Sequence, residues 1–426
     1  MFSYNRLLAI IMKLEKLTIL FVDIMNKKIS VVSILVTIVL NLTSCTPPPL
    51  QLQINSAFPI YPTTALGLFD ITSFDVYSDN QRLHAVVSGK KSSDDMQGVI
   101  YYLQSTDEGQ HWSPPINLNT NGLSKILAGR GSDVQIAARD QNLVVIWQSS
   151  GELPSSGPLV SVYSADGGKT WQAGPNPAVD NGGDQAHPDL LVDHQGNFHV
   201  VWLADPEENG YQSLRYARST NHGVSWQMPV TLDQTTCSCC WNTLAESPND
   251  KIHVLYRDMN PRDMALLSSS DHGFTWQDKK TLGEFNWQFD GCPHVGGGLA
   301  VDANGFYASV WTGEASHSGL YTVSSKNSLP VKIGKNATHS DIAVLNDKPY
   351  HLVLVWDELS PEGTGIFSAE SYDGGMTWSI AKRLSAIGTH ATHPHVTATA
   401  SGFLVLWTEK QEKQTTSRWA ILHQPF

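Results

Sequence analysis

One eight-residue pattern, Ser-x-Asp/Asn-x-Gly-x-x-Trp, recurs through the chain and limits the folds that the chain can adopt. The copies are STDEGQHW (105–112), SADGGKTW (164–171), STNHGVSW (219–226), SSDHGFTW (269–276) and SYDGGMTW (371–378). Their starts are separated by 59, 55, 50 and 102 residues, and the last interval is two periods of 51. In such a turn the Asp or Asn accepts backbone hydrogen bonds, the Gly takes a positive φ and the Trp packs the turn onto a sheet. A period of this length predicts a propeller or another array of small sheets.

An apolar strand forms a second repeated feature, and it usually ends in an aromatic residue. The strands are RLHAVVSG (82–89), LVVIW (143–147), FHVVW (198–202), IHVLY (252–256), FYASVW (306–311), LVLVW (352–356) and FLVLW (403–407). These seven strands, rich in β-branched and aromatic residues, predict seven blades. The fifth repeat has lost the turn pattern and reads TVSSKNSLP (322–330). The seventh repeat ends too early for an outer strand, so we expect LQLQINSAF (50–58) to supply that strand and close the ring.

The five turns are identified as Asp boxes, and the chain resembles the sialidase-like, or BNR-repeat, β-propellers. The positions that carry the resemblance are Asp107, Asp166, Asn221, Asp271 and Asp373. The resemblance implies an all-β propeller that occupies residues 59–426 as a single domain. Seven blades are expected, and six, the usual number in sialidases, are the alternative. In this family Asp boxes are structural and lie on the outside of the blades, so they indicate the fold more strongly than an activity.

The residues that this resemblance would require for sialidase activity are largely missing. A sialidase of the family holds the substrate carboxylate with three arginines and uses a Tyr–Glu pair and an Asp acid/base. The segment FPIYPTTALGLFDITSF (58–74), where the first arginine is expected, contains none, and the last tyrosine is Tyr372 in the final Asp box. The catalytic candidates that remain are Arg257, Asp258 and Arg262, and Arg215 is a further carboxylate ligand. Alternatively, Arg257 and Asp258 only connect a strand end to a loop.

The N-terminal region predicts export and lipid attachment. Lys27 and Lys28 precede an apolar run, Ile29–Leu42, that suits the core of a signal peptide, and residues 1–44 are therefore excluded from the fold. Met25 is the expected start. The sequence LTSC before Thr46 resembles a bacterial lipoprotein cleavage site, which implies acylation of Cys45, an outer-membrane lipoprotein and a tether over 45–58. An uncleaved anchor helix is the alternative.

Charge limits the partners that we expect. Removal of residues 1–44, which carry five basic and two acidic side chains, takes the formal charge from −12 to about −15. An acidic chain of this kind is a poor partner for nucleic acids. We expect a monomer that contacts the membrane through its lipid and a glycan or protein through its propeller.

Cysteine and histidine recur where the innermost strand of each blade is expected to begin. The segments are AHPDLLVD (186–193), TTCSCCWNTLA (235–245), DGCPHVGGGLAVD (290–302), ATHSDIAVL (337–345) and THATHPHVTATA (389–400). Equivalent positions converge in a closed ring, so we expect a Cys/His-rich ring near one mouth of the channel. Thiolates and imidazoles suit copper, or zinc as second choice. The candidate ligands are Cys237, Cys239, Cys240, Cys292, His187, His294, His339, His393 and His395.

Disulfides are the alternative account of the cysteines. The exported chain would hold four cysteines besides Cys45, and an even number is typical of disulfide-bonded proteins. A bridge from Cys292 to the 237–240 cluster would link blades four and five. Three functions therefore remain: a glycan- or protein-binding module at the channel mouth, to which Trp241, Trp287 and the acidic loop 204–210 contribute; a copper-binding or redox protein; and a glycoside hydrolase of the exo-α-sialidase type.

Overall fold

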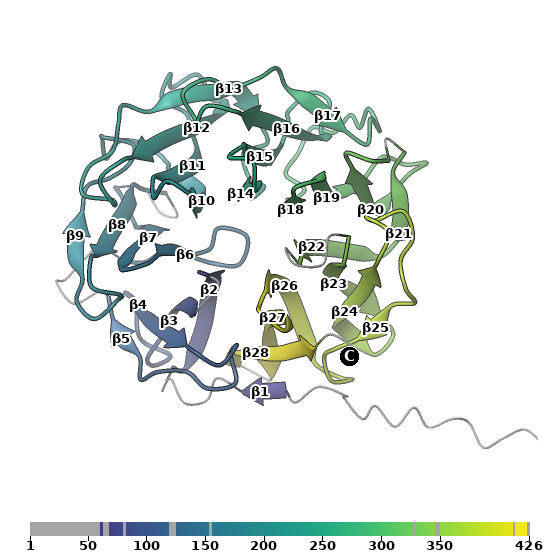
Figure 1. Cartoon of the computed structure of the whole chain (residues 1–426), viewed down its shortest axis with the longest axis horizontal. Coiled ribbons are helices and arrows are strands. Elements are labelled where there is room, and N and C mark those ends of the chain that lie inside the picture. The colour runs from purple at the N-terminus through teal and green to yellow at the C-terminus, as the bar shows by residue number, and fades with distance from the viewer. Residues whose placement is uncertain are drawn as a thin grey trace, which may run out of the picture. The chain divides into compact units, whose positions relative to one another are not determined.

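Short antiparallel sheets arranged around a central axis make up the described part of the protein (Figure 1). The structure, a computed structural model, describes residues 60–62, 68–79, 82–118, 125–152, 156–327, 329–345, 350–411 and 414–423. Within these ranges there is no helix, and the strands pair into seven four-stranded sheets. The prediction of an all-β propeller is confirmed.

Each sheet runs from an innermost strand at the axis to an outermost strand at the rim. In that order, the first three sheets consist of β2 (Asp70–Ser78), β3 (Leu83–Lys90), β4 (Val99–Ser105) and β5 (Ile116–Asn117); β6 (Gln135–Arg139), β7 (Asn142–Gln148), β8 (Leu159–Ser164) and β9 (Gln172–Gly174); and β10 (Ala186–Val192), β11 (Phe198–Ala204), β12 (Gln212–Ser219) and β13 (Val230–Thr236). The next three consist of β14 (Thr243–Glu246), β15 (Ile252–Arg257), β16 (Met264–Ser269) and β17 (Lys280–Leu282); β18 (Gly298–Asp302), β19 (Gly305–Thr312), β20 (Gly319–Ser324) and β21 (Val331–Gly334); and β22 (Ala337–Val344), β23 (Leu352–Ser360), β24 (Gly363–Ser371) and β25 (Lys382–Arg383). The last sheet consists of β26 (His390–Ala398), β27 (Gly402–Gln411), β28 (Gln414–His423) and β1 (Ile60–Pro62).

The last sheet closes the ring with a strand from the other end of the chain. β1 pairs antiparallel with β28, on the rim side of β26 and β27. Closure by an N-terminal strand was the expectation, and in the described residues the strand that pairs with β28 is Ile60–Pro62. The expected segment 50–58 lies outside the described residues. The closing strand gives the last sheet its fourth strand, and a propeller leaves only short edges at the axis and the rim.

The aromatic strand ends form the interior of the blades. Trp147, Trp202, Trp356 and Trp407 and the equivalent Tyr256 are all at most 2% exposed. Apolar contacts between neighbouring sheets surround them, because a propeller blade is apolar on both faces.

The five Asp-box turns share one hydrogen-bonding pattern at the ends of β4, β8, β12, β16 and β24. In each turn the Ser hydroxyl donates to the Asp or Asn oxygen over 2.8–3.0 Å and accepts the N–H of the Gly over 2.9–3.0 Å. The Gly takes a positive φ, and a Cβ on Gly273 would overlap Tyr216 of the preceding blade. Trp276 packs edge-on against the same Tyr216 ring at 5.0 Å, so each such turn fastens one blade to the previous one.

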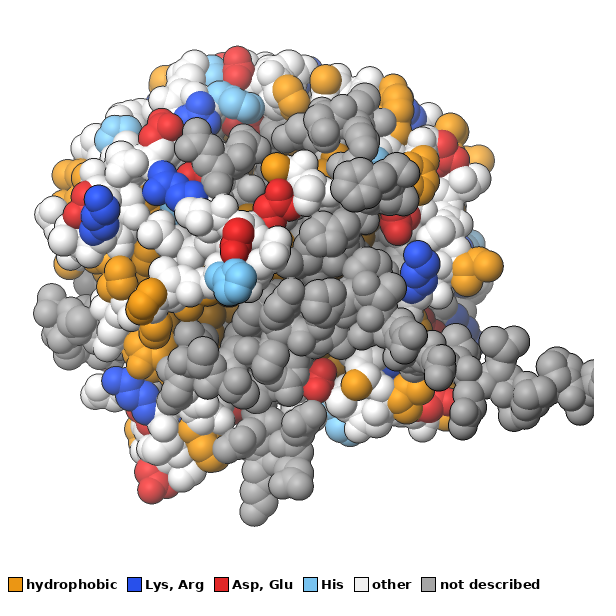
Figure 2. Space-filling model, turned by 60° about the horizontal axis from the view of Figure 1, so that its bottom comes forward, with side chains coloured by type: hydrophobic (Ala, Val, Ile, Leu, Met, Phe, Trp, Pro, Cys, Tyr) orange, Lys and Arg blue, Asp and Glu red, His pale blue; other side chains and the backbone are white. Residues whose placement is uncertain are grey.

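The propeller forms one compact unit, Phe58–Phe426. The expected signal region, Cys45 and the segment 50–58 lie outside the described residues, so export and lipid attachment stay predictions. In the described ranges we find no helix of a length and apolarity suited to crossing a membrane. Acidic and basic side chains are interspersed over the face seen in Figure 2.

Candidate functional site at the propeller axis

A cavity of about 370 Å³ lies at the axis, and the innermost strands line it. One residue near the start of the innermost strand in each blade lines it. In blade order these seven residues are Asp75, Gln135, Asp189, Thr243, Gly297, Asp341 and His395. In the blades of Gln135, Asp189, Thr243, Asp341 and His395, this residue pairs with the one just before the aromatic strand end. The seven positions hold five residue types, and three of them are Asp.

Three carboxylates of this set also hold the blades together. Asp75 accepts the N–H of Val76 in its own strand and the N–H of Ile136 in the next blade, over 2.7 and 2.8 Å. Asp189 and Asp341 make the same pair of contacts to the blades that follow them. Burial raises the pKa of Asp75, and it raises the pKa of Asp189 to about 7. A neutral carboxyl group at the axis is thus accessible near neutral pH.

His395 lies between two of these carboxylates. Its Nδ1 is 2.8 Å from Asp341 Oδ2, and its Nε2 is 3.8 Å from Asp75 Oδ1. Burial alone would lower the pKa of this imidazole, but the charge of Asp341 and the hydrogen bond to it outweigh burial and raise the pKa to about 9. An imidazolium therefore stands beside the carboxylates at the axis.

β-bulges place three histidines at equivalent positions of the innermost strands. In β10, β22 and β26 the ladder skips two residues, which together oppose one buried Trp of the next strand. The first skipped residue has a positive φ in each case: His187 (52°), His339 (40°) and His393 (51°). Bulges of this kind redirect a side chain out of the sheet and are frequent beside binding sites.

His339, His393 and Trp241 form the mouth of the cavity. The two imidazoles stack at 3.9 Å, and the Trp241 ring lies 5.9 Å from His339 and 6.0 Å from His393. A Cβ on Gly296 would overlap the Trp241 indole, so the ring rests directly on backbone of blade five. Trp241 is partly exposed and presents an aromatic surface to the cavity.

Asp357 positions the histidine pair from behind. Its Oδ2 contacts His339 Nδ1 at 2.8 Å and accepts the backbone N–H of His393 at 3.0 Å. Burial and the neighbouring His339 lower the pKa of His393 well below its usual value, whereas the bond to His339 helps to lower the pKa of Asp357 despite its burial. His339, Asp357 and His393 bring one ligand atom each within 4.8 Å of one another, so they are a second candidate metal group.

Three buried polar atoms that line this cavity have no hydrogen-bond partner among the described residues. They are Arg130 Nε, His393 Nδ1 and Asn242 Oδ1. The rest of the Arg130 guanidinium is fixed, because it donates to Asp133, to the Phe74 carbonyl and to the His393 carbonyl, and it stacks over the Phe74 ring. These three residues line the same cavity as Trp241, so a free donor, a free acceptor and an imidazole nitrogen belong to its wall.

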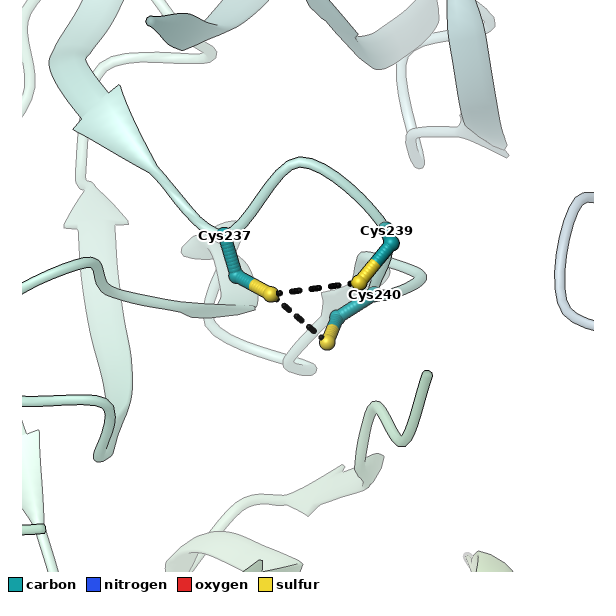
Figure 3. Close-up of side chains that lie close together, drawn as sticks. All are labelled: Cys237, Cys239 and Cys240. Carbon is teal, nitrogen blue, oxygen red and sulfur yellow. Dashed lines mark hydrogen bonds between the residues drawn. The ribbon is translucent and has the colours of Figure 1, made fainter. Parts of the chain in front are cut away.

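The three neighbouring cysteines form a separate cluster between β13 and β14 (Figure 3). Cys237 Sγ lies 3.0 Å from Cys240 Sγ and 3.7 Å from Cys239 Sγ, and no disulfide joins them. Cys237 and Cys240 are each 1% exposed, and Cys239 is 9% exposed. The expected bridge from Cys292 is also absent, because all four described cysteines are free.

The predicted ligands therefore fall into two groups rather than one ring. His339, His393 and His395 line the axial cavity, and the cysteines do not. Cys292 is exposed, with its Sγ 3.5 Å from Ser238 Oγ, and His294 is exposed near it. The prediction of a single ring was wrong, because the cysteines lie in the loop before the position of blade four that corresponds to the bulge histidines. Trp241 occupies that position.

His187 lies between the two groups. Its Nδ1 contacts the Gly131 carbonyl at 2.7 Å, and its backbone carbonyl accepts from Asn242. Burial lowers the pKa of His187. This histidine is not among the residues that line the axial cavity as the structure describes it.

The arginine candidates for catalysis are structural. Arg257 is 1% exposed, and its guanidinium donates to the carbonyls of Val295, Arg262 and Trp311.

The remaining candidates make contacts of the same kind. Arg262 donates through Nε to the Phe289 carbonyl, and Asp258 pairs with Lys279. The guanidinium of Arg215 donates to the Thr231 hydroxyl. None of the four lines the axial cavity as the structure describes it, which favours the interpretation that they connect strand ends and loops.

The other residues expected near the mouth are also accounted for. Trp287 is 6% exposed and packs against Phe289 and Trp311, so it belongs to the core. The loop 204–210 is held by Asp205, which accepts the N–H groups of Asn209 and Gly210. Neither lines the cavity.

Sequence reasoning missed Arg130 and the axial aspartates. A signal for them existed, because the triplets Gly131-Ser-Asp, His187-Pro-Asp, His339-Ser-Asp and His393-Pro-His recur before the innermost strands. The third residue of three of these triplets, at positions 189, 341 and 395, is an axial residue.

Comparisons with known proteins agree with this architecture. A family model described as a BNR repeat-like domain matches residues 74–288. No curated protein matches the sequence. Similar solved structures include a Dyadobacter fermentans protein of unknown function (13% identity, TM-score 0.51, 84% of this chain and 96% of that one) and an ulvan lyase from a polysaccharide lyase family (12%, 0.55, 83% and 95%).

A third similar structure is the sialidase of Trypanosoma rangeli, with 12% identity and a TM-score of 0.50 over 83% of this chain and 55% of that one. At these identities the likeness shows the fold and no activity. The family model covers half of the sequence, and the sheets have the matching architecture. The chain belongs to the BNR repeat-like family and has a sialidase-like β-propeller fold.

Proposed function

We propose that this protein, as a seven-bladed propeller, binds a glycan at the axial mouth. The observation that carries the proposal is the set of unpartnered polar atoms beside Trp241: Arg130 Nε, His393 Nδ1 and Asn242 Oδ1. Buried polar atoms in folded proteins are nearly always satisfied, so a set that shares one cavity points to a ligand with matching groups.

Sugar hydroxyls have the properties that these atoms require. A hydroxyl both donates and accepts, so neighbouring hydroxyls of one sugar ring can serve Arg130 Nε and Asn242 Oδ1 together. The apolar face of a sugar ring can pack on the exposed face of Trp241, which Gly296 holds from behind. A cavity with one aromatic wall and a few converging polar groups is typical of small-molecule sites.

Charge favours a neutral glycan. The cavity wall carries four aspartates, at positions 75, 133, 189 and 341, against the cations Arg130 and His395. Arg130 is already paired with Asp133. His395 is paired with Asp341 in the same way, so an anionic sugar would find both of these cations already paired. The ulvan lyase and the sialidase support a glycan ligand only through their shared fold, and the contacts of Arg257 and Arg262 speak against a sialidase-type carboxylate site.

A binding experiment on the full chain tests this function. Neutral and anionic oligosaccharides are screened on an array, and the best neutral ligand is titrated by calorimetry against wild type and Trp241→Ala. We expect at least a tenfold weaker Kd for the variant, since stacking on an aromatic ring and its water exclusion are lost. Tyr211→Ala, a truncation of an exposed aromatic outside the cavity, is the control and should bind as wild type. Binding of anionic glycans alone, or equal binding by Trp241→Ala, would refute the proposal.

A further inference from the structure

A second site lies outside the axial cavity, in the loop that joins β13 to β14. Cys237, Cys239 and Cys240 bring their three Sγ atoms within 4.8 Å of one another. All three are buried, and they pack together as a cluster of their own. Three thiols in such proximity fill space poorly for a hydrophobic core, whereas they match the donor set of a thiophilic metal ion.

The ends of this loop are fixed before any ligand binds. The N–H of Cys237 donates to the Arg257 carbonyl at 3.0 Å, and Thr236 bridges to Asp258 in the same segment. On the other side, the Asn242 side chain donates to the His187 carbonyl. Since both ends are held by neighbouring strands, the three sulfur atoms are positioned by the fold, which reduces the ordering cost of binding an ion.

A buried cation belongs to the strand end beside the cluster. The N–H of Cys237 donates to the carbonyl of Arg257, whose side chain is buried. Arg257 itself is buried and donates only to backbone carbonyls in the contacts described. Three thiolates, one divalent cation and Arg257 together carry no net charge, which is the arrangement that burial tolerates best.

We propose that Cys237, Cys239 and Cys240 bind one thiophilic metal ion, zinc(II) or copper(I), as a three-thiolate site with one open position. Around a tetrahedral ion with metal–sulfur bonds of about 2.3 Å, the sulfur atoms lie ~3.8 Å apart. The Cys237–Cys239 separation of 3.7 Å already fits, and the Cys237–Cys240 separation of 3.0 Å requires opening by about 0.8 Å.

The fourth position is left to an external ligand. Cys292 contacts Ser238 on the outside of the loop and is not part of the three-sulfur group. Zinc sites with three protein ligands keep one position open for water or another ligand, whereas closed four-ligand sites are structural. The cluster therefore suits a site that takes an external ligand more than a purely structural one, and its cysteines do not line the axial cavity as the structure describes it.

The test uses the full chain, purified under anaerobic reducing conditions and stripped of metal. Zinc(II) and copper(I) are titrated in separate arms against chromophoric chelators, and the bound metal is counted by mass spectrometry. We expect one equivalent of at least one ion, and the arm that binds more tightly identifies it. Cobalt(II) substituted into the site should give thiolate-to-metal absorption bands.

Two matched Cys→Ser variants locate the site. Cys239→Ser should weaken metal binding at least a hundredfold, and Cys292→Ser should change it less than threefold. Thermal unfolding and glycan binding show whether Cys239→Ser is still folded; if it is not, Cys240→Ala takes its place. Absence of metal binding in reduced wild type, equal binding by the folded variants, or a Cys237–Cys240 disulfide that reductants leave intact would overturn the proposal.

Discussion

The outer ends of the blades repeat one structure, whereas the inner ends differ from blade to blade. At the outer end, five Asp-box turns repeat one set of hydrogen bonds, and their Ser and Gly residues are nearly identical from blade to blade. At the inner end, seven equivalent positions hold five different residue types. The residues that repeat between blades thus maintain the fold, whereas the positions that differ between blades mark where their functions differ.

The largest effect should follow from a matched pair of tryptophan truncations. Trp202 is 1% exposed in the core and lies opposite the His187 bulge, whereas Trp241 lies partly exposed at the mouth. We expect Trp202→Ala to lower the free energy of unfolding by about 3–5 kcal/mol, and Trp241→Ala by clearly less. Denaturant unfolding monitored by circular dichroism measures both.

Trp202→Phe, a milder change than Trp202→Ala, separates the loss of packing volume from the loss of a hydrogen bond. Trp202 Nε1 has no hydrogen-bond partner in the described structure, so Trp202→Phe loses volume but no bond. Trp202→Phe should lower the free energy of unfolding much less than Trp202→Ala does. If Trp241→Ala proved as damaging as Trp202→Ala, the mouth would be part of the core and the contrast between the two ends would fail.

A smaller effect should come from the outer turns. Ser269 is fully buried, donates to Asp271 Oδ1 at 2.8 Å and accepts the Gly273 N–H at 2.9 Å. Ser269→Ala leaves that N–H unsatisfied and should cost about 1–3 kcal/mol of unfolding free energy. Unfolding in urea gives the value.

The fifth blade offers the control for this turn. Ser324 ends β20 at the equivalent position, but Lys326 replaces the Asp, and Ser324 Oγ accepts only a longer bond of 3.2 Å from the Asn327 N–H. Ser324→Ala should therefore cost less than Ser269→Ala. Equal losses would mean that the Asp box adds nothing beyond a buried serine.

The sequence predicted the outer ends well and the inner ends only in part. An Asp box is a local turn whose contacts span five residues, so its pattern is visible in the sequence. The bulge histidines were also visible, because a His followed two residues later by Asp or His recurs near the start of three innermost strands. What could not be read was the contact between blades: His395 meets Asp75 across the closing seam, about 320 residues away, and Trp241 takes the position expected for a cysteine.

The smallest effect concerns the charge of His395. Its pKa is raised to about 9 in the folded protein, above an unfolded value near 6.5. The folded state therefore holds a proton that the unfolded chain releases between these values. Stability from this group is fully present below pH 6.5 and is lost as the pH rises through 9. About a third of this side chain is exposed, so water reduces the effect.

Comparison with His395→Gln isolates this contribution from the other titrating groups. The raised pKa of Asp189 also lowers stability as the pH rises, but between about 4 and 7, and the lowered pKa of His393 acts mainly below pH 6.5. Between pH 7.5 and 9.5 the difference in unfolding free energy between wild type and His395→Gln should therefore shrink, because wild type loses its imidazolium and the variant has none. A difference that stays constant over this range would mean that His395 is neutral at the axis and adds no charge-dependent stability to the inner ends.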